Sequence, residues 1–181
     1  GIFHRVTGVL TSQRMDILSA EIHTLAQGLV LDRFHVRDRD FSGQPPESRL
    51  AEVCDKLKAE LESPSVRAPR FAPVWGSQNR NGAAVRAHQP PPQVRLDNST
   101  AERFTIVDVF AIDRTGLLYT VTRQLFELGL SVHMAKIGTH LDQVVDVFYV
   151  TDSQGRKVVD EDQLEDIRAT LLAKIEEFEK S

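Results

Sequence analysis

The sequence has few of the features that mark membrane or secreted proteins. Its apolar runs fall short of the roughly 18 residues that a membrane-spanning helix needs. The first residues, GIFHRVTG, lack the charged start and apolar core of a signal peptide. The single cysteine, Cys54, has no internal partner, which favours a reducing cytoplasm, and we expect it to be a small buried residue on a helix. Because position 1 is not methionine, we also expect a longer parent chain.

Acidic residues are missing altogether between Ser63 and Leu96, where five arginines and most of the prolines occur. Such a stretch cannot hold a helix, so we interpret residues 63–91 as a basic, Pro/Gly-rich linker. Its aromatic residues Phe71 and Trp75 are not interleaved with basic residues at a regular spacing. With a net charge of −4 over 181 residues, the sequence predicts binding neither to nucleic acid nor to membranes.

An internal repeat is the main positive feature of the sequence. The first forty residues match a later segment at an offset of 115, which becomes 114 after a one-residue slip. The matching residues before the slip are Gly1, Val6, Thr7, Leu10, Ala20, Ile22 and Thr24 with Gly116, Val121, Thr122, Leu125, Ala135, Ile137 and Thr139. Those after it are Val30, Asp32, Phe34, Val36 and Asp38 with Val144, Asp146, Phe148, Val150 and Asp152. The pattern indicates a duplicated unit.

The second copy predicts the order strand, helix, strand, strand, helix. We expect strands over 104–112, 130–137 and 144–151, a helix ending near Gly129, and a last helix from Asp160 or Asp162 with Glu165 in a capping box. One face of this last helix is expected to carry a stripe of buried apolar residues, namely Leu164, Ile167, Leu171, Ile175 and Phe178. Residues Val94–Asp97 would supply a fourth strand, which gives a ferredoxin-like unit.

The first copy predicts the same order without its first strand. Its strands fall near 16–24 and 29–37, and its second helix starts at Pro46-Glu47. The expected core face of that helix is Leu50, Val53, Cys54, Leu57 and Leu61. The fold class is therefore α+β, with two ferredoxin-like units (βαββαβ), the first lacking its N-terminal strand. We place the first domain at 1–62, the linker at 63–91 and the second domain at 92–181.

No catalytic or metal-binding motif is evident. Asp38 and Asp40 have the D-x-D spacing of a metal-dependent transferase, but no nucleotide-binding loop precedes them, so we interpret them as a solvated turn. The histidines include no H-E-x-x-H spacing, and His23 and His133 lie on strand patterns where a hydrogen-bonded structural role is expected. We predict no catalytic residues, no metal site and no cofactor.

The turn Asp113-Arg114-Thr115-Gly116, followed by Leu117-Leu118, is the candidate binding site. It falls where a strand passes into a helix, whose first N–H groups lack internal partners and attract anions. Gly116 would let a ligand approach the backbone, and Asp113 adds a negative charge nearby. This combination suits a zwitterion such as a free amino acid. In the alternative interpretation, Asp113 simply caps the helix.

The motif DRTGLL, with LSVHMAKIGTH and VVDVFYVTD after it, resembles an ACT domain. More narrowly, both repeats and the lead-in PQVRLDN resemble the tandem ACT repeats of the bacterial PII uridylyltransferase/uridylyl-removing enzymes. The resemblance implies a regulatory module that senses glutamine, while uridylyl transfer and removal, with their Mg and UTP, belong to absent catalytic domains that act on the PII protein.

The resemblance also assigns the ligand site. It places Asp113 and Gly116 at the ligand, with Arg114, Thr115, Leu117 and Leu118 beside them, and in the first copy only Gly1 remains at the matching position. A second ACT unit, in the same chain or in another one, would form the opposite wall. Two alternatives stay open: the ACT tail of a (p)ppGpp synthetase or of a stand-alone ACT-repeat protein, and an interaction module that binds no ligand.

Overall fold

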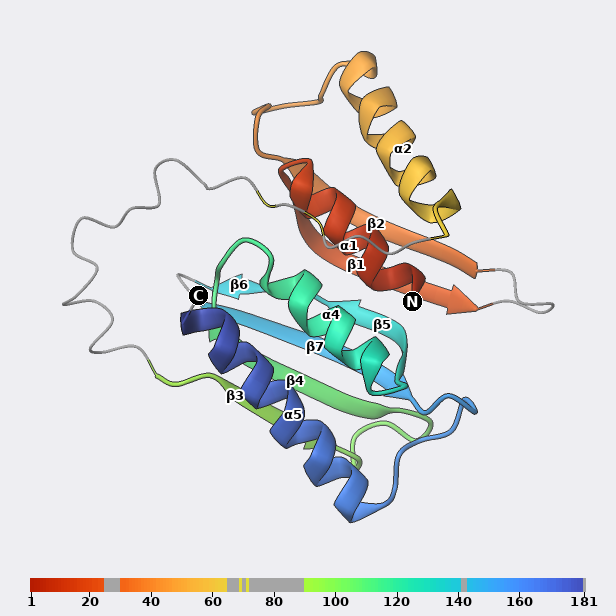
Figure 1. Cartoon of the computed structure of the whole chain (residues 1–181), viewed down its shortest axis with the longest axis vertical. Helices are drawn as coiled ribbons and strands as arrows, with labels where there is room; N and C mark the ends of the chain where they lie inside the picture. The colour runs from red at the N-terminus through yellow and green to blue at the C-terminus, as the bar shows by residue number, and fades with distance from the viewer. Residues whose placement is uncertain (25–29, 65–68, 70, 72–89, 141–142, 181) are drawn as a thin grey trace.

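The computed structural model describes residues 1–24, 30–64, 69, 71, 90–140 and 143–180, and it has an α+β fold (Figure 1). The helices and strands in chain order are α1 (Ile2–Ser12), β1 (Met15–Thr24), β2 (Val30–Asp38), α2 (Glu47–Glu62), β3 (Gln93–Asp97), β4 (Thr105–Ile112), α4 (Leu117–Glu127), β5 (Ser131–Lys136), β6 (Thr139–His140), β7 (Gln143–Thr151) and α5 (Glu161–Lys180). The predicted elements are confirmed, and the structure adds the short strand β6, which lies in the segment between the two strands expected over 130–137 and 144–151.

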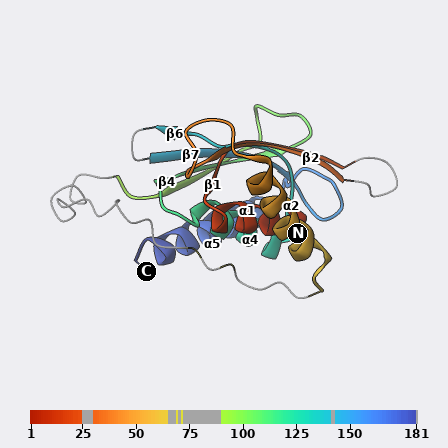
Figure 2. The ribbon, with the colours of Figure 1, turned by 90° about the horizontal axis from the view of Figure 1, so that it is seen from above.

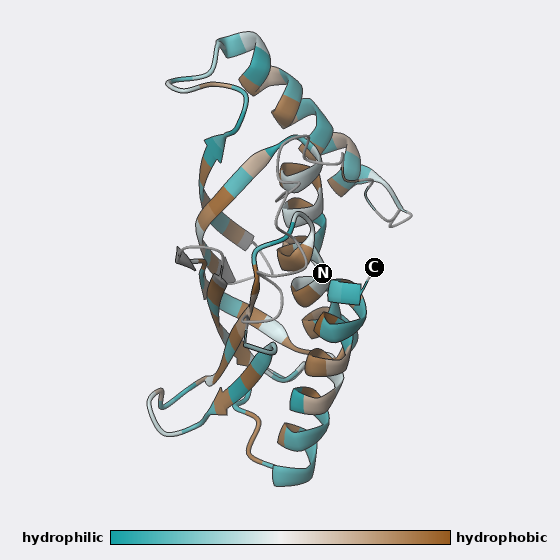
Figure 3. Ribbon diagram, turned by 90° about the vertical axis from the view of Figure 1, so that its left-hand side faces the viewer, coloured by the Kyte–Doolittle hydropathy of each residue, from teal (hydrophilic) through white to brown (hydrophobic). Residues whose placement is uncertain are grey.

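The strands form one sheet in the order β2-β1-β5-β7-β4-β3, and every pairing between neighbours is antiparallel. The described helices α1, α2, α4 and α5 lie on one face of this sheet (Figure 2). Their apolar sides face the strands, as the hydropathy colouring in Figure 3 shows. The protein therefore has two layers, and its core lies between them.

The second unit is the complete one. Its strands lie in the order β5-β7-β4-β3, with β3 paired to β4, as the sequence predicts for a ferredoxin-like unit. The stripe of α5 is confirmed, because Ile167, Leu171 and Ile175 are buried in the main core. Asp160 accepts a hydrogen bond from Gln163 N at 2.8 Å, which fixes the start of the helix. The predicted capping box is wrong, since Glu165 pairs with Arg168 instead.

The first unit has a much smaller core of Val6, Leu10, Met15, Ile17 and Val53. The predicted core face of α2 is largely wrong: Leu50 and Leu61 are each 41% exposed, and Cys54 is exposed rather than buried. In the second unit α5 packs across β3 and β4, and no counterpart of those two strands lies beside β2 among the described residues. The apolar stripe of α2 therefore has little to pack against.

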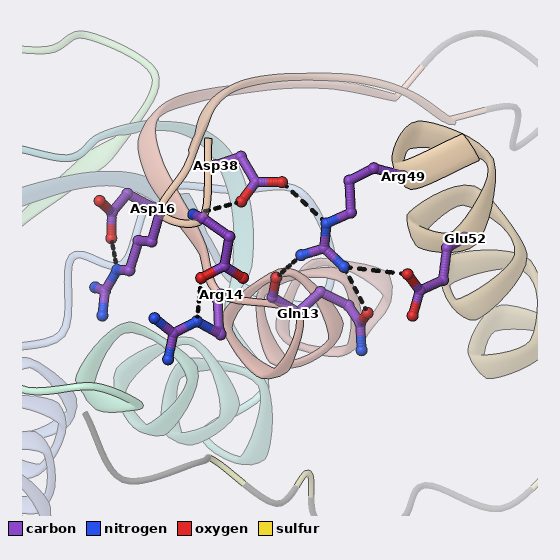
Figure 4. Close-up of polar contacts among 8 residues, drawn as sticks. Gln13, Arg14, Asp16, Asp38, Arg49 and Glu52 are labelled. Atoms are coloured by element: carbon purple, nitrogen blue, oxygen red, sulfur yellow. Dashed lines mark hydrogen bonds and ion pairs between the residues drawn. The ribbon is translucent and has the colours of Figure 1, made fainter. Parts of the chain in front are cut away.

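A cluster of charged residues ties α2 to the end of β2 (Figure 4). Arg49 Nε donates to Asp38 Oδ2 at 3.0 Å, and its Nη2 donates to Gln13 O. Burial raises the pKa of Asp38, but hydrogen bonds from Asp40 N and Arg49 outweigh it and hold this pKa below its usual value. The Asp38 side chain is only 1% exposed, so the expectation of a solvated turn is wrong for Asp38. It is confirmed for Asp40, which lies in a bend with its side chain 41% exposed.

The two units join through strands β1 and β5 and helices α1 and α4. Ala20 pairs with Ala135 across the strands, and the hydroxyls of Thr7 and Thr122 lie 3.1 Å apart across the helices. Both pairs consist of residues that match at the offset of 115 in the repeat. The units are therefore related by a local two-fold axis that passes between equivalent residues.

Candidate functional site

A cavity of about 320 Å³ lies where the two units meet. The second unit contributes the turn 113–118 together with Ile137, Val144 and Asp146. The first unit contributes Thr11, Met15, Asp16, Ile17, Leu18, Arg37 and Arg39. All six residues of the DRTGLL motif therefore line one space, and the opposite wall comes from the same chain.

The start of α4 opens onto this cavity. Gly116 is the residue before the helix, with a left-handed φ of +96°, and no side chain caps the helix by a hydrogen bond. The interpretation of Asp113 as the helix cap is therefore wrong. Leu117 N donates to Arg114 O at 3.0 Å, which closes the turn. The remaining N–H groups of the first turn carry the positive end of the helix dipole, so this wall favours an anion.

Arg114 holds the turn in place. Its Nη1 donates to the carbonyl oxygens of Phe178 at 3.0 Å and Glu179 at 2.7 Å, at the C-terminal end of α5. A guanidinium at this position complements the negative end of the α5 dipole. Ile112 N donates to Glu179 Oε1 at 3.3 Å, so the end of β4 is tied to the same place. The guanidinium of Arg114 therefore interacts mainly with the C-terminal end of α5.

The wall from the first unit is polar but largely self-paired. Arg37 Nη2 donates to Asp16 Oδ2 at 2.9 Å, and Arg39 Nε donates to Asp16 Oδ1. The Asp16 side chain is 18% exposed and accepts from both arginines. These three residues bring both signs of charge to the cavity, and because two arginines share one carboxylate they leave a net charge of +1.

Asp146 is the unusual residue of this site. It lies on β7 between Val145 and Val147, it is 1% exposed, and it lines the cavity. Gly138 N donates to its Oδ1 at 3.3 Å, a long hydrogen bond. Burial raises the pKa of Asp146 to about 7, and the negative charge of Asp113 adds to this shift. The carboxyl is therefore about half protonated near neutral pH.

Gly1, the remaining predicted site residue, lies elsewhere. It precedes α1, and a Cβ at this position would meet the ring of His4 at 2.2 Å and that of Phe126 at 2.9 Å. It does not line the cavity. His4 is packed beside it against Tyr119 and Phe126, and burial lowers the pKa of this histidine to about 4, with the positive N-terminus and nearby arginines adding to the effect.

Two further expectations concern metals and membranes. Within the described ranges, no group of three or more histidine, cysteine or acidic residues is placed to hold a metal ion. Nor does any helix in the described part of the chain have the length and apolar character to cross a membrane. His133 forms a hydrogen bond with Thr151 Oγ1 at 3.0 Å, which confirms the expected structural role of this histidine. The His23 side chain lies outside the described residues, and so does most of the predicted linker.

Comparison with known proteins decides the family. Residues 93–178 match the family model described as ACR9-like, ACT-like domain. This second unit is an ACT-like domain. The cavity lies at its boundary with the first ferredoxin-like unit. No solved structure gives a significant match.

Curated relatives of the chain carry the name bifunctional uridylyltransferase/uridylyl-removing enzyme. The Azospirillum brasilense protein is 36% identical over 176 residues, which cover 95% of this chain and 18% of the relative. The Gluconobacter oxydans protein is 34% identical over 179 residues, or 97% of this chain and 18% of the relative. The Erythrobacter litoralis protein is 35% identical over 175 residues. The chain thus spans about a fifth of the length of these relatives.

Sequence reasoning missed Asp146 and the charged wall formed by Asp16, Arg37 and Arg39. One signal for Asp146 was present, because it is the single acid on the inward-facing side of an otherwise apolar strand. A second signal was its match with Asp32 in the repeat. The residues of the first unit carried no such signal, because only the pairing of the two units brings them to the cavity.

Proposed function

We propose that this chain is the amino-acid-sensing regulatory part of a uridylyltransferase/uridylyl-removing enzyme, with glutamine as the first candidate ligand. The observation that carries the proposal is the cavity at the junction of the ACT units, which contains the whole DRTGLL motif. Uridylyl transfer and removal, and action on the PII protein, are assigned to other parts of the longer parent enzyme. The relatives' printed name and their greater length support this division.

The chemistry of the cavity suits a zwitterion. The uncapped start of α4 offers backbone N–H groups to a carboxylate, and Asp113 and Asp146 offer negative charge to an ammonium group. A volume of about 320 Å³ is in the range of small-ligand sites. Because both units line the cavity, a bound ligand would contact both and so favour one arrangement of the pair. Such coupling is what a regulatory module requires.

Calorimetry and thermal unfolding with L-glutamine, alongside a panel of the other amino acids, test this proposal. Glutamine should raise the midpoint of unfolding, and each tenfold increase above saturation should add about 1.4 kcal/mol to the free energy of unfolding. Asp113→Asn should weaken binding, whereas Asp55→Asn on the exposed surface of α2 should leave it unchanged. If no amino acid stabilises the chain, an interaction module without a ligand becomes the better account.

A further inference from the structure

Asp146 is a buried carboxyl group that pairs with no cation in the part of the chain that the structure describes. It is 1% exposed and lies on the helix-covered side of β7, where its neighbours Val144, Phe148 and Val150 are fully or nearly fully buried. Gly138 N is its one hydrogen-bond donor among the described residues, and the bond is made to Oδ1 alone. Burial of an unpaired carboxylate is costly unless the group is neutralised or finds a positive partner.

Within the described ranges, the charged groups around Asp146 do not supply that partner. Arg37 and Arg39 pair with Asp16, and Arg114 bonds to the end of α5. Asp108 and Lys136 both pair with Val147, one residue further along β7, so they lie on the opposite face of the sheet. Asp113, in the turn before α4, also lines the cavity, and Glu179, near the end of α5, accepts a hydrogen bond from Ile112 N; both are acids and neither can supply a positive charge.

The cavity is lined both by the start of helix α4, which has no side-chain cap, and by the carboxyl group of Asp146. The helix start favours a negative group, and the carboxyl group favours a positive one. A small molecule that carries a carboxylate and an ammonium group satisfies both at once.

We propose that Asp146 binds the ammonium group of the ligand inside this cavity, and that it exchanges a proton for that group on binding. The inference rests on the proposed amino-acid site and adds a residue and a pH response to it. Without ligand, the Asp146 carboxyl holds a proton in acidic solution and is about half protonated at neutral pH, because burial and Asp113 raise its pKa to about 7. When the ligand binds, this proton leaves to solvent, and the ammonium group keeps its three protons and pairs with the carboxylate.

The pH dependence follows from this exchange. Below pH 7 the ligand must displace a proton, so its apparent affinity should rise by up to about tenfold per pH unit. Above pH 8 the empty site is already ionised, and the affinity should level off. An analogue that lacks the amine, such as glutaramic acid, should bind more weakly and without release of a proton.

Calorimetry on the whole chain tests the proposal, with L-glutamine as the probe at pH 6, 7 and 8 in buffers of different ionisation enthalpy. We expect proton release at pH 6 that fades by pH 8 in the native chain. Asp146→Asn should bind at least tenfold more weakly at pH 8 and should lose the proton release. Asp55→Asn, on the exposed surface of α2, is the matched control and should retain both affinity and proton release.

The possible outcomes separate the two proposals. Binding of glutamine without proton release, or with proton release that persists in Asp146→Asn, overturns the role of Asp146 and leaves the amino-acid site standing. Absence of binding by any amino acid overturns both. Carboxyl NMR titration of the empty chain gives a second measurement, since the inference fails if Asp146 titrates near 4.

Discussion

Thr7 and Thr122 face each other at the contact between helices α1 and α4, with 3.1 Å between their hydroxyl oxygens. They are equivalent residues of the repeat, and both are buried. Thr7 Oγ1 also lies 2.9 Å from His4 O, and Thr122 Oγ1 lies 2.8 Å from Leu118 O. Each hydroxyl has one proton, so at most one of them can donate across the interface.

This pair should show energetic coupling between the two units. Replacing either threonine by valine leaves the other hydroxyl with one partner fewer, so each single variant should lose about 1 kcal/mol in the free energy of unfolding. The double variant, Thr7→Val with Thr122→Val, should cost less than the sum because no buried hydroxyl remains. Urea unfolding of the four proteins measures the coupling energy. Additive losses would show that the contact does not couple the units.

Gly116→Ala should be destabilising for two separable reasons. The φ of +96° disfavours a residue with a side chain, by roughly 1–2 kcal/mol. In addition, a Cβ here would come within 2.7 Å of the Phe71 ring. Gly155→Ala is the control for φ alone, because Gly155 has a φ of +77° and open space around its Cβ.

Thermal unfolding distinguishes these two contributions. Gly116→Ala should cost more than Gly155→Ala, and a chain that carries both Gly116→Ala and Phe71→Ala should recover the difference relative to Phe71→Ala alone. Equal losses for the two glycine variants would mean that Phe71 moves aside without cost.

Arg49→Met should destabilise the first unit strongly. It removes the guanidinium next to Asp38, whose side chain is 1% exposed, and it leaves that carboxylate buried without its cation. Loss of one member of a buried pair costs roughly 3 kcal/mol or more. Arg168→Met is the control, because its partner Glu165 is largely exposed and such pairs contribute less than about 1 kcal/mol.

The loss in Arg49→Met should also depend on pH. The folded-state pKa of Asp38 lies below the unfolded value of 3.8, so its stabilising effect is present above that value and is lost as the pH falls through the lower, folded pKa. Denaturant unfolding at pH 7 and at pH 3 should therefore show a smaller gap between the variant and the native chain in acid. A gap that does not change with pH would contradict the ion pair as the cause.

Asp146→Asn should stabilise the empty chain in alkaline solution. An acid whose folded pKa is raised to about 7 from an unfolded value of 3.8 contributes stability at low pH, and this contribution disappears as the pH rises toward 7. The asparagine avoids the cost of a buried charge, so its advantage over the native residue should grow from pH 5 to pH 8. Parallel urea titrations at these two values provide the measurement, and an advantage that shrinks would exclude a raised pKa.

The sequence predicted best where a local pattern also has a partner to pack against. The stripe of α5 is buried as expected, because β3 and β4 lie beneath it. The equivalent stripe of α2 had the same periodicity, yet Leu50, Cys54 and Leu61 are exposed. Periodicity shows which face of a helix is apolar, but only the sheet below decides how much of that face is buried.

The candidate site was predictable on one side only. The turn from Asp113 to Gly116 was predicted as a binding site because it falls between a strand and a helix. The structure places this turn at a cavity. Arg37 and Arg39 reach the same cavity through the antiparallel pairing of β1 with β5, a contact between distant segments that residue spacing does not encode. In the sequence, Asp146 is distinguished only as an acid among apolar residues. Its burial at the cavity, which the structure shows, is what makes it a candidate site residue.

The outer edge of β2 has a consequence for the behaviour of the chain in solution. Within the part of the chain that the structure describes, β2 pairs with β1 on one side and with no strand on the other, so it presents open backbone groups. Open edges invite association between copies unless charged side chains line them. Arg33 and Arg37 lie along this strand and are largely exposed, with 72% and 67% of their side chains accessible. We expect these charges to oppose pairing of β2 with a second copy of the chain.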